Sequence, residues 1–176
     1  MSNYVYIATS LDGFIAEKDG GLEWLTEYPN PDGSDFGYAD FMQTLDVIVM
    51  GRVTFETVLS FGQWPYNKPV WVMSRTLVDV PPDTIGKAMI VDGGPLSVLE
   101  QAHTAGYENV YVDGGSVIRS FLNEDLIDEM IITIVPVALG EGIPLFTQLS
   151  RRLQFSLEKS ETLIGQFVRN HYVRVR

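Results

Sequence analysis

The sequence predicts a three-layer α/β domain with a mixed, mostly parallel central sheet, and two patterns carry this prediction. Along most of the 176 residues, short apolar and β-branched runs alternate with segments of helical periodicity. The chain then finishes in two strand-like runs, 153 to 161 and 166 to 175, which favour an antiparallel hairpin around Gly165. Since no linker is evident, we expect one domain over residues 1 to 176.

The expected elements are bounded by glycine, proline or a change of periodicity. The first strand covers 3 to 9 and runs into a glycine-broken loop from about 13 to 35, which contains Trp24 and Tyr28. That loop either covers a ligand or is an ordinary surface excursion anchored by a buried tryptophan. The remaining elements, in chain order, are a helix over 35 to 44, a strand over 46 to 50, a helix after Gly51, strands over 68 to 73 and 88 to 91, a helix ending near Gly106, a strand over 109 to 113 with a helix after it, and a strand over 129 to 136.

The stretch from Asn109 to Leu122 joins a strand to a helix through Gly114, Gly115 and Ser116. Ser116 can act as the N-cap of that helix, and the glycines allow an anion to approach the free amides before Val117. We interpret this turn as a cradle for a nucleotide pyrophosphate. A plain tight turn between a strand and a helix explains the same residues about equally well.

Two further strand ends carry residues that could bind phosphate. Gly51, Arg52 and Thr54 follow one strand, and Ser74 and Arg75 follow the next. Open α/β sheets bind ligands at this edge, and an arginine fork beside a hydroxyl matches a phosphate monoester. The alternative is that Thr54 only caps a helix and Arg52 is a solvated charge.

The charge balance restricts the class of ligand. Twelve Lys and Arg against 23 Asp and Glu give a net charge of −11, which should repel nucleic acid and anionic membranes. Three of the few cations, Arg52, Arg75 and Arg119, are expected just after strand ends, which favours a small anionic ligand. With no cysteine and only two distant histidines, we expect no metal, and a zinc deaminase is excluded. No long apolar run or secretory leader is evident, so we expect a cytoplasmic protein.

Five segments together resemble the dihydrofolate-reductase-like superfamily, in particular the reductase domain of bifunctional riboflavin-biosynthesis proteins. They are Ala8 to Ala16, Met50 to Glu56, Met73 to Arg75, Val112 to Ser116 and Pro136 to Phe146, in the family's order. The resemblance implies an NADPH-dependent oxidoreductase with a dihydrofolate-reductase-like fold and a cis Gly114–Gly115 peptide. It implies that Arg52, Ser74 and Arg75 contact the 2′-phosphate, and that Thr54 and the amides of Gly114, Gly115, Ser116 and Val117 hold the pyrophosphate. It also implies that Gly51 belongs to the cofactor site and that backbone groups of Ala8 and Ile15 fix the nicotinamide carboxamide.

The implied chemistry is hydride transfer to a small heterocyclic or aminopyrimidine-type substrate, similar to the reduction by 5-amino-6-(5-phosphoribosylamino)uracil reductase in riboflavin biosynthesis. The alternatives are a dihydrofolate or pterin reductase and a non-catalytic nucleotide-binding module on the same fold. Asp12 and Asp40 are the candidate proton donors, although Asp12 also suits a turn. Few cations remain for a phosphorylated substrate once the cofactor is assigned. The apolar finishing strands and the family habit favour a homodimer, without a heptad pattern to support it.

Overall fold

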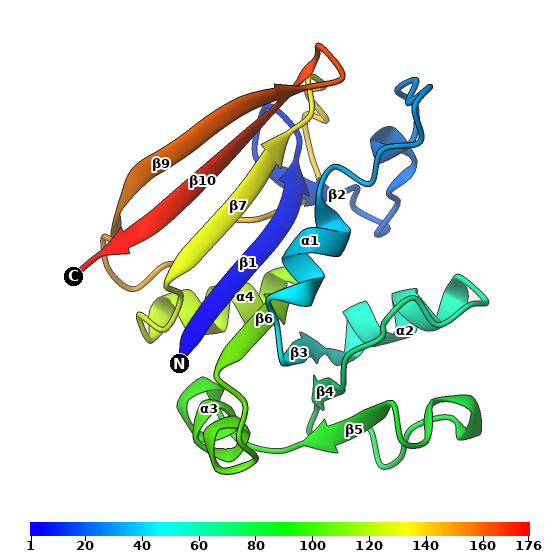
Figure 1. Ribbon diagram of the computed structural model, residues 1–176, viewed down its shortest axis with the longest axis vertical. Helices are drawn as coiled ribbons and strands as arrows, with labels where there is room; N and C mark the ends of the chain where they lie inside the picture. Colours follow the sequence, from blue (N-terminus) through cyan, green and yellow to red (C-terminus); the bar gives the residue numbers. More distant parts are fainter.

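Eight strands form the central sheet of the protein in the computed structural model, which describes residues 1–176 (Figure 1). The strands are β1 (Ser2–Thr9), β3 (Val47–Gly51), β4 (Val70–Met73), β5 (Ala88–Val91), β6 (Asn109–Asp113), β7 (Glu129–Ile134), β9 (Gln154–Leu163) and β10 (Phe167–Val175). Their spatial order is β5-β4-β3-β6-β1-β7-β10-β9. The first six of these run parallel to one another, and β10 and β9 complete the sheet in antiparallel pairing. The predicted mixed α/β architecture with an antiparallel finish is therefore confirmed.

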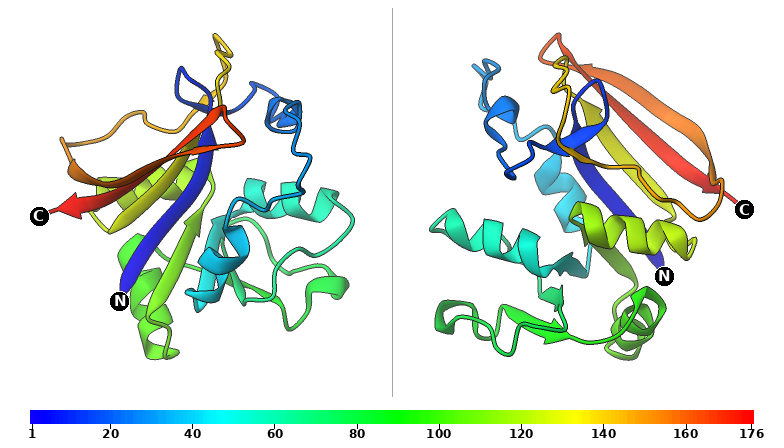
Figure 2. Two further views of the ribbon diagram at one scale, coloured as in Figure 1. Left: turned by 45° about the horizontal axis from the view of Figure 1, so that its top comes forward. Right: turned by 180° about the vertical axis from the view of Figure 1, so that it is seen from behind.

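Helices cover both faces of this sheet (Figure 2). They are α1 (Tyr38–Gln43), α2 (Arg52–Ser60), α3 (Pro95–Thr104) and α4 (Gly115–Asn123). Side chains of α1 and α2 join one apolar cluster, in which Phe41 and Phe55 pack with Met50 of β3. Side chains of α3 and α4 join the other, in which Ile118 packs with Val49 of the same strand. β3 is buried at all five positions because it contributes to both clusters, which explains its unbroken apolar sequence.

A small second sheet closes the segment that follows β1. β2 (Phe14–Ala16) pairs with β8 (Ile143–Pro144), and a 3₁₀ turn follows at Glu23–Leu25. Trp24 in that turn is 2% exposed and packs with Val135 and Phe167. The segment from 13 to 35 is therefore anchored by a buried tryptophan, as the second of its two interpretations proposed. A second 3₁₀ turn lies at Pro82–Thr84.

The first helix is shorter than predicted. It begins at Tyr38, not at residue 35, because Gly37 takes a φ of +79° and breaks the helical path. The Asp35 carboxylate lies outside the helix and accepts hydrogen bonds from the backbone N–H of Gly37 and of Ala39, at 2.9 and 2.8 Å. These bonds satisfy amides at the start of α1 that have no partner within the helix.

No helix in the structure is long and apolar enough to cross a bilayer.

Candidate cofactor and substrate site

The topology brings the predicted strand ends to one edge of the sheet. β1, β3, β4 and β6 are parallel, with Met50 of β3 aligned with Asp113 of β6 and Gly51 aligned with Met73 of β4. The segments after these strands therefore emerge side by side, although they are far apart in sequence. Parallel α/β sheets bind ligands at this edge.

The turn from β6 into α4 is packed so closely that only glycine fits. Gly114 takes a φ of +86°, and a Cβ at this position would overlap the hydroxyl of Thr54 on α2. A Cβ at Gly115 would lie 2.5 Å from the Cδ1 atom of Ile15, and one at Gly51 would lie 3.1 Å from Val117. Strand β2 and the turns after β3 and β6 thus meet around the first turn of α4. No side chain caps α4, so its first amides stay available to an anion.

Two expectations about this turn are wrong. Ser116 is not the N-cap, because the helix already begins at Gly115 and Gly114 occupies the cap position. The Gly114–Gly115 peptide is not cis, since the structure contains no cis peptide bond. The positive φ of Gly114 makes the bend that brings its backbone against Thr54.

The predicted arginines differ in whether a carboxylate or a carbonyl already accepts a hydrogen bond from the guanidinium. Arg52 donates to both carboxylate oxygens of Glu56 one helical turn later, each at 2.8 Å. Arg75 is exposed and makes no ion pair, and the neighbouring Ser74 hydroxyl accepts from the backbone N–H of Leu77 at 2.9 Å. Arg119 was expected just after a strand end. It lies within α4, where its guanidinium donates to the Pro144 carbonyl. Arg75 is therefore the cation best placed for an external phosphate.

Asp12 is built into the backbone of its loop. It accepts a 2.6 Å hydrogen bond from the Ser10 hydroxyl and further bonds from the N–H groups of Leu139 and Gly140. The Ser10 hydroxyl, followed by these amides, lowers the pKa of the Asp12 carboxyl below its ordinary value. A carboxylate held in this way is a poor proton donor at neutral pH, and its visible role is to join the β1–β2 turn to the segment after β7.

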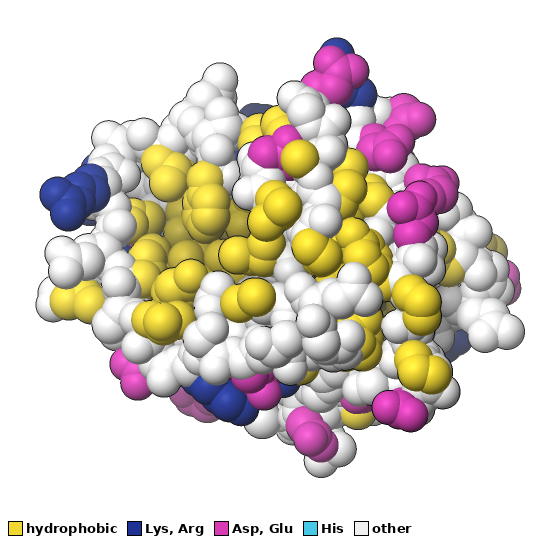
Figure 3. Space-filling model, turned by 90° about the horizontal axis from the view of Figure 1, so that it is seen from above, with side chains coloured by type: hydrophobic (Ala, Val, Ile, Leu, Met, Phe, Trp, Pro, Cys, Tyr) yellow, Lys and Arg dark blue, Asp and Glu magenta, His cyan; other side chains and the backbone are white.

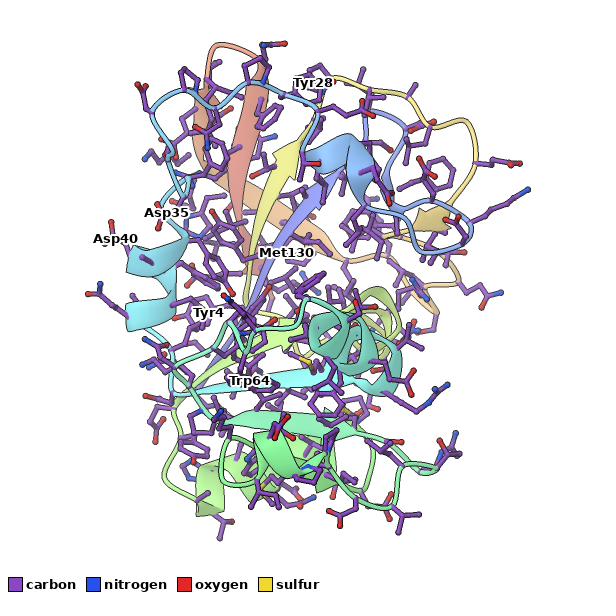
Figure 4. All side chains as sticks on the ribbon, turned by 90° about the vertical axis from the view of Figure 1, so that its right-hand side faces the viewer. Tyr4, Tyr28, Asp35, Asp40, Trp64 and Met130 are labelled. Atoms are coloured by element: carbon purple, nitrogen blue, oxygen red, sulfur yellow. The ribbon has the colours of Figure 1, made fainter.

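Asp40 lies on the outer side of α1, away from Trp64 and the carboxyl edge (Figure 4). It lines a separate cavity of about 420 Å³ between α1 and the C-terminal hairpin, together with Glu129, Glu161, Arg169 and His171. The structure does not bring Asp40 together with Gly114. The two proposed donors therefore lie at different places, Asp12 in the turn between β1 and β2 and Asp40 on α1.

The sequence interpretation missed Asp113, the last residue of β6. It is partly buried at the centre of the sheet, where Gly114 donates its N–H to the Oδ1 atom at 2.8 Å. Burial raises the pKa of the Asp113 carboxyl to about 6. Its position within the Val-Asp-Gly-Gly segment was visible in the sequence, but nothing there distinguished it from an ordinary turn residue. A carboxyl group that titrates near neutral pH is suited to proton exchange.

Three tyrosines lie close enough to Asp113 for its charge to affect them, and a tryptophan packs on one of these tyrosines. Tyr38 comes from α1, Tyr111 from β6, and Trp64 and Tyr66 from the segment between α2 and β4, with the Trp64 and Tyr66 rings 5.6 Å apart. Burial and then the nearby Asp113 carboxylate raise the pKa of the Tyr38, Tyr66 and Tyr111 hydroxyls. We call these five residues the Asp113 cluster. The phenols therefore stay protonated at neutral pH, while the carboxyl is the member that can change charge.

Residues 4–168 match the family described as the RibD C-terminal domain. The chain belongs to this family. A Bacillus subtilis relative, YwjB, is 37% identical over 175 residues, covering 97% of this chain and 96% of the relative. A crystal structure of a protein from Shewanella sp. PV-4, whose name refers to riboflavin biosynthesis, is 45% identical with a TM-score of 0.97 over 100% of both chains. Dihydrofolate reductase from Enterococcus faecalis, complexed with NADP(H), shares the fold, with a TM-score of 0.68, 17% identity and coverage of 99% and 97%.

These likenesses establish a dihydrofolate-reductase-like fold of the riboflavin-pathway reductase type. They agree with the sequence segments that carried the resemblance, all of which lie on or beside the carboxyl edge. No group of three or more histidine, aspartate or glutamate side chains is arranged to hold a metal ion.

Proposed function

We propose that the protein is an NADPH-dependent reductase of a small heterocycle of the aminopyrimidine type. The observation that carries this proposal is the fit at Gly114, where the Thr54 hydroxyl occupies the space that any side chain would need. Such close packing beside the uncapped amides of α4 matches a pyrophosphate, which needs backbone donors without Cβ atoms in its path. The family and the NADP(H) complex of the dihydrofolate reductase support a nicotinamide cofactor.

In this proposal the chain's own residues bind and orient. Thr54 and the amides of Gly115 to Val117 hold the pyrophosphate beside Gly51, and Ser74 and Arg75 bind the 2′-phosphate that distinguishes NADPH from NADH. Backbone groups of Ala8 and Ile15 orient the nicotinamide carboxamide. The bound cofactor supplies a hydride, and the protein supplies position and the exclusion of water.

Calorimetric titration with NADPH and NADH tests the cofactor assignment. We expect NADPH to bind roughly tenfold or more tightly, because only its 2′-phosphate can pair with Arg75. The variant Arg75→Gln should remove most of this preference. Arg52→Gln is the matched control and should keep more of it, since Glu56 already engages that guanidinium. Equally weak binding of both nucleotides would overturn the cofactor assignment.

A dihydrofolate or pterin reductase is less well supported. Such an enzyme would place a carboxylate from the first helix beside the nicotinamide, whereas Asp40 faces away from the carboxyl edge. Little or no turnover of dihydrofolate is expected, and a spectrophotometric assay with NADPH measures it.

We also propose that the protein forms a homodimer through the apolar face of the C-terminal strands. Figure 3, which looks onto the carboxyl ends of β1 and β7, shows apolar side chains around a hollow. A cavity of about 340 Å³ is lined by seven hydrophobic residues, among them Met130, Phe155 and Tyr172. On the edge strand β9, Leu157 is 56% exposed. Sedimentation equilibrium of the wild type and of Leu157→Glu tests this proposal, and a wild type that stays monomeric at high concentration contradicts it.

A further inference from the structure

We propose that Arg119 is a positioning residue for the nicotinamide end of the cofactor, because its guanidinium fixes β8, and through β8 also β2, against the first turn of α4. This inference rests on the proposed function, in which Ile15 of β2 orients the carboxamide and the first amides of α4 hold the pyrophosphate. It adds that one side chain sets the spacing between these two contacts, and that this side chain acts through the backbone of β8 and β2.

The first support is the hydrogen bond from Arg119 to the backbone of β8. The Nη1 atom donates to the Pro144 carbonyl at 2.9 Å. β8 is the only sheet partner of β2, and Pro144 lies opposite Phe14 in this pairing. Ile15 follows Phe14, so its backbone belongs to a strand whose partner is tied to α4 by Arg119.

The second support is the space at Gly115, one helical turn before Arg119. Side chains on a helix lean toward its N-terminus, so the Arg119 side chain lies over Gly115. A Cβ at Gly115 would lie 3.0 Å from Nη1 of Arg119 and 2.5 Å from Cδ1 of Ile15. The guanidinium and Ile15 therefore meet over the first turn of α4, beside the amides that no side chain caps. Gly115 leaves room for both of them.

The third support is that this bond has no equivalent among the neighbouring charges. The half-buried Arg119 forms no ion pair, and the Pro144 carbonyl is the acceptor of its one hydrogen bond. Lys18 and Glu141 also join the segment after β2 to the segment before β8, at 2.5 Å, but their side chains are 67% and 68% exposed. An ion pair in water contributes little, whereas a charged donor on a partly buried carbonyl contributes more.

The bond can be removed without detaching β8 from the protein. Leu145, which follows Pro144, is fully buried, and its N–H donates to the Gly13 carbonyl at 3.0 Å. A variant at Arg119 should therefore stay folded and lose only the fixed position of β8 and β2 relative to α4.

Calorimetric titration with NADPH and with 2′,5′-ADP, which has the phosphate end of the cofactor but no nicotinamide, tests this inference. Arg119→Met keeps the length of the side chain and removes its donors. We expect this variant to bind NADPH roughly tenfold more weakly and 2′,5′-ADP within about twofold of the wild type. Arg119→Lys, which keeps a charged donor, should recover most of the NADPH affinity. Lys18→Met removes the same charge from the neighbouring ion pair and should leave both affinities unchanged.

The fluorescence of bound NADPH at saturation provides a second measurement, since a reduced nicotinamide that is held away from water emits more strongly than a mobile one. We expect weaker emission in Arg119→Met than in Lys18→Met, with circular dichroism verifying that both variants are folded.

Equal NADPH affinity in the wild type and Arg119→Met would overturn the inference. An equal loss for NADPH and 2′,5′-ADP would also overturn it, because the charge of Arg119 would then act on the phosphates and not on the nicotinamide end. The titration of the wild type distinguishes these results from a failure of the proposed function. If the wild type binds neither nucleotide, the cofactor assignment fails and this inference fails with it.

Discussion

The chain uses the sequence Val-Asp-Gly-Gly twice, and the two copies have different surroundings. The copy Val91 to Gly94 starts at the last residue of β5, and the copy Val112 to Gly115 starts within β6, whose last residue is Asp113. Their local geometry is similar, since the aspartate in each accepts a 2.8 Å hydrogen bond from the next N–H, and the glycines that follow have φ values of +118° and +86°. The backbone of the turn is therefore set by the four residues themselves.

What differs is the position in the sheet. β5 is an edge strand, Asp92 is exposed, and the helix after it begins with Pro95, which has no N–H to offer. β6 lies between β3 and β1, so Asp113 is partly buried and Gly114 meets Thr54. A turn becomes a candidate site through its neighbours, and the comparison can be tested by making the same change in both copies.

Alanine substitution at the first glycine of each copy should have the largest effect. Both φ values are unfavourable for alanine, which costs about 1–2 kcal/mol in either turn. Gly114→Ala also places its Cβ in overlap with the Thr54 hydroxyl, whereas a Cβ at Gly93 would lie 2.8 Å from the Ser97 hydroxyl, which can rotate away, and 3.0 Å from the Ser97 Cβ, a milder clash. We expect Gly114→Ala to lose NADPH binding by about 100-fold or more and Gly93→Ala to retain it. Urea unfolding and calorimetry measure the two effects, and equal NADPH affinity in both variants would remove the distinction.

Asparagine substitution of the two aspartates should separate them by the pH dependence of stability. The pKa of the Asp113 carboxyl is raised from its ordinary value of 3.8 to about 6 in the folded state. At any pH between these two values, the folded protein therefore binds more protons than the unfolded protein. The contribution of this carboxyl to the free energy of unfolding is therefore lost as the pH rises through that window, by at most about 3 kcal/mol. Asp113→Asn should become more stable relative to the wild type as the pH rises from about 4 to 7.

Asp92→Asn provides the control for this measurement. Carboxylates whose pKa is lowered, such as those of Asp46 and Asp125, lose their contribution at more acidic pH in every variant and cancel in the difference. A difference between the wild type and Asp113→Asn that stays constant with pH would show that the carboxyl is not perturbed by its position.

Asp12 and Gly13, after β1, form another aspartate-glycine pair that can be compared with the two copies. We expect substitution of Asp12 to have the smallest effect of the three. Because the Ser10 hydroxyl and two amides stabilise the charged form of Asp12, we expect Asp12→Asn to lower the melting temperature modestly at neutral pH. The loss should shrink as the pH falls through the lowered pKa of the carboxyl, where the wild type also loses the charge. Retained turnover would exclude Asp12 as the proton donor, and abolished turnover with unchanged stability would contradict its structural role.

Much of the fold could be predicted because strand and helix periodicities are local. The apolar runs of β3 and β6, and the hairpin around Gly165, fall where the sequence places them. The start of α1 could not be predicted, since Asp35 caps it from outside and Gly37 breaks the helical path. Ser116 was assigned as a cap because serine suits that position, but Gly114 already occupies it.

The candidate site was only partly predictable. Glycines and hydroxyls at strand ends identify the cofactor edge, since a strand followed at once by a helix places them there. The state of each charge depends on its neighbours. Glu56 pairs with Arg52 one helical turn away, which the sequence spacing allows, whereas the Pro144 carbonyl that accepts from Arg119 is distant in sequence. The pKa of Asp113 is raised by burial, which also depends on the tertiary fold. The strand order that places β6 beside β1 is a property of the tertiary fold, and no residue pattern in the sequence states it.

A crystal structure with bound NADPH tests the central claim most directly. The account predicts the pyrophosphate against the amides of Gly115 to Val117 beside Thr54, the 2′-phosphate on Ser74 and Arg75, and the nicotinamide near Ala8 and Ile15. A nucleotide bound at the turn after β5, or one whose phosphates avoid the start of α4, would contradict it.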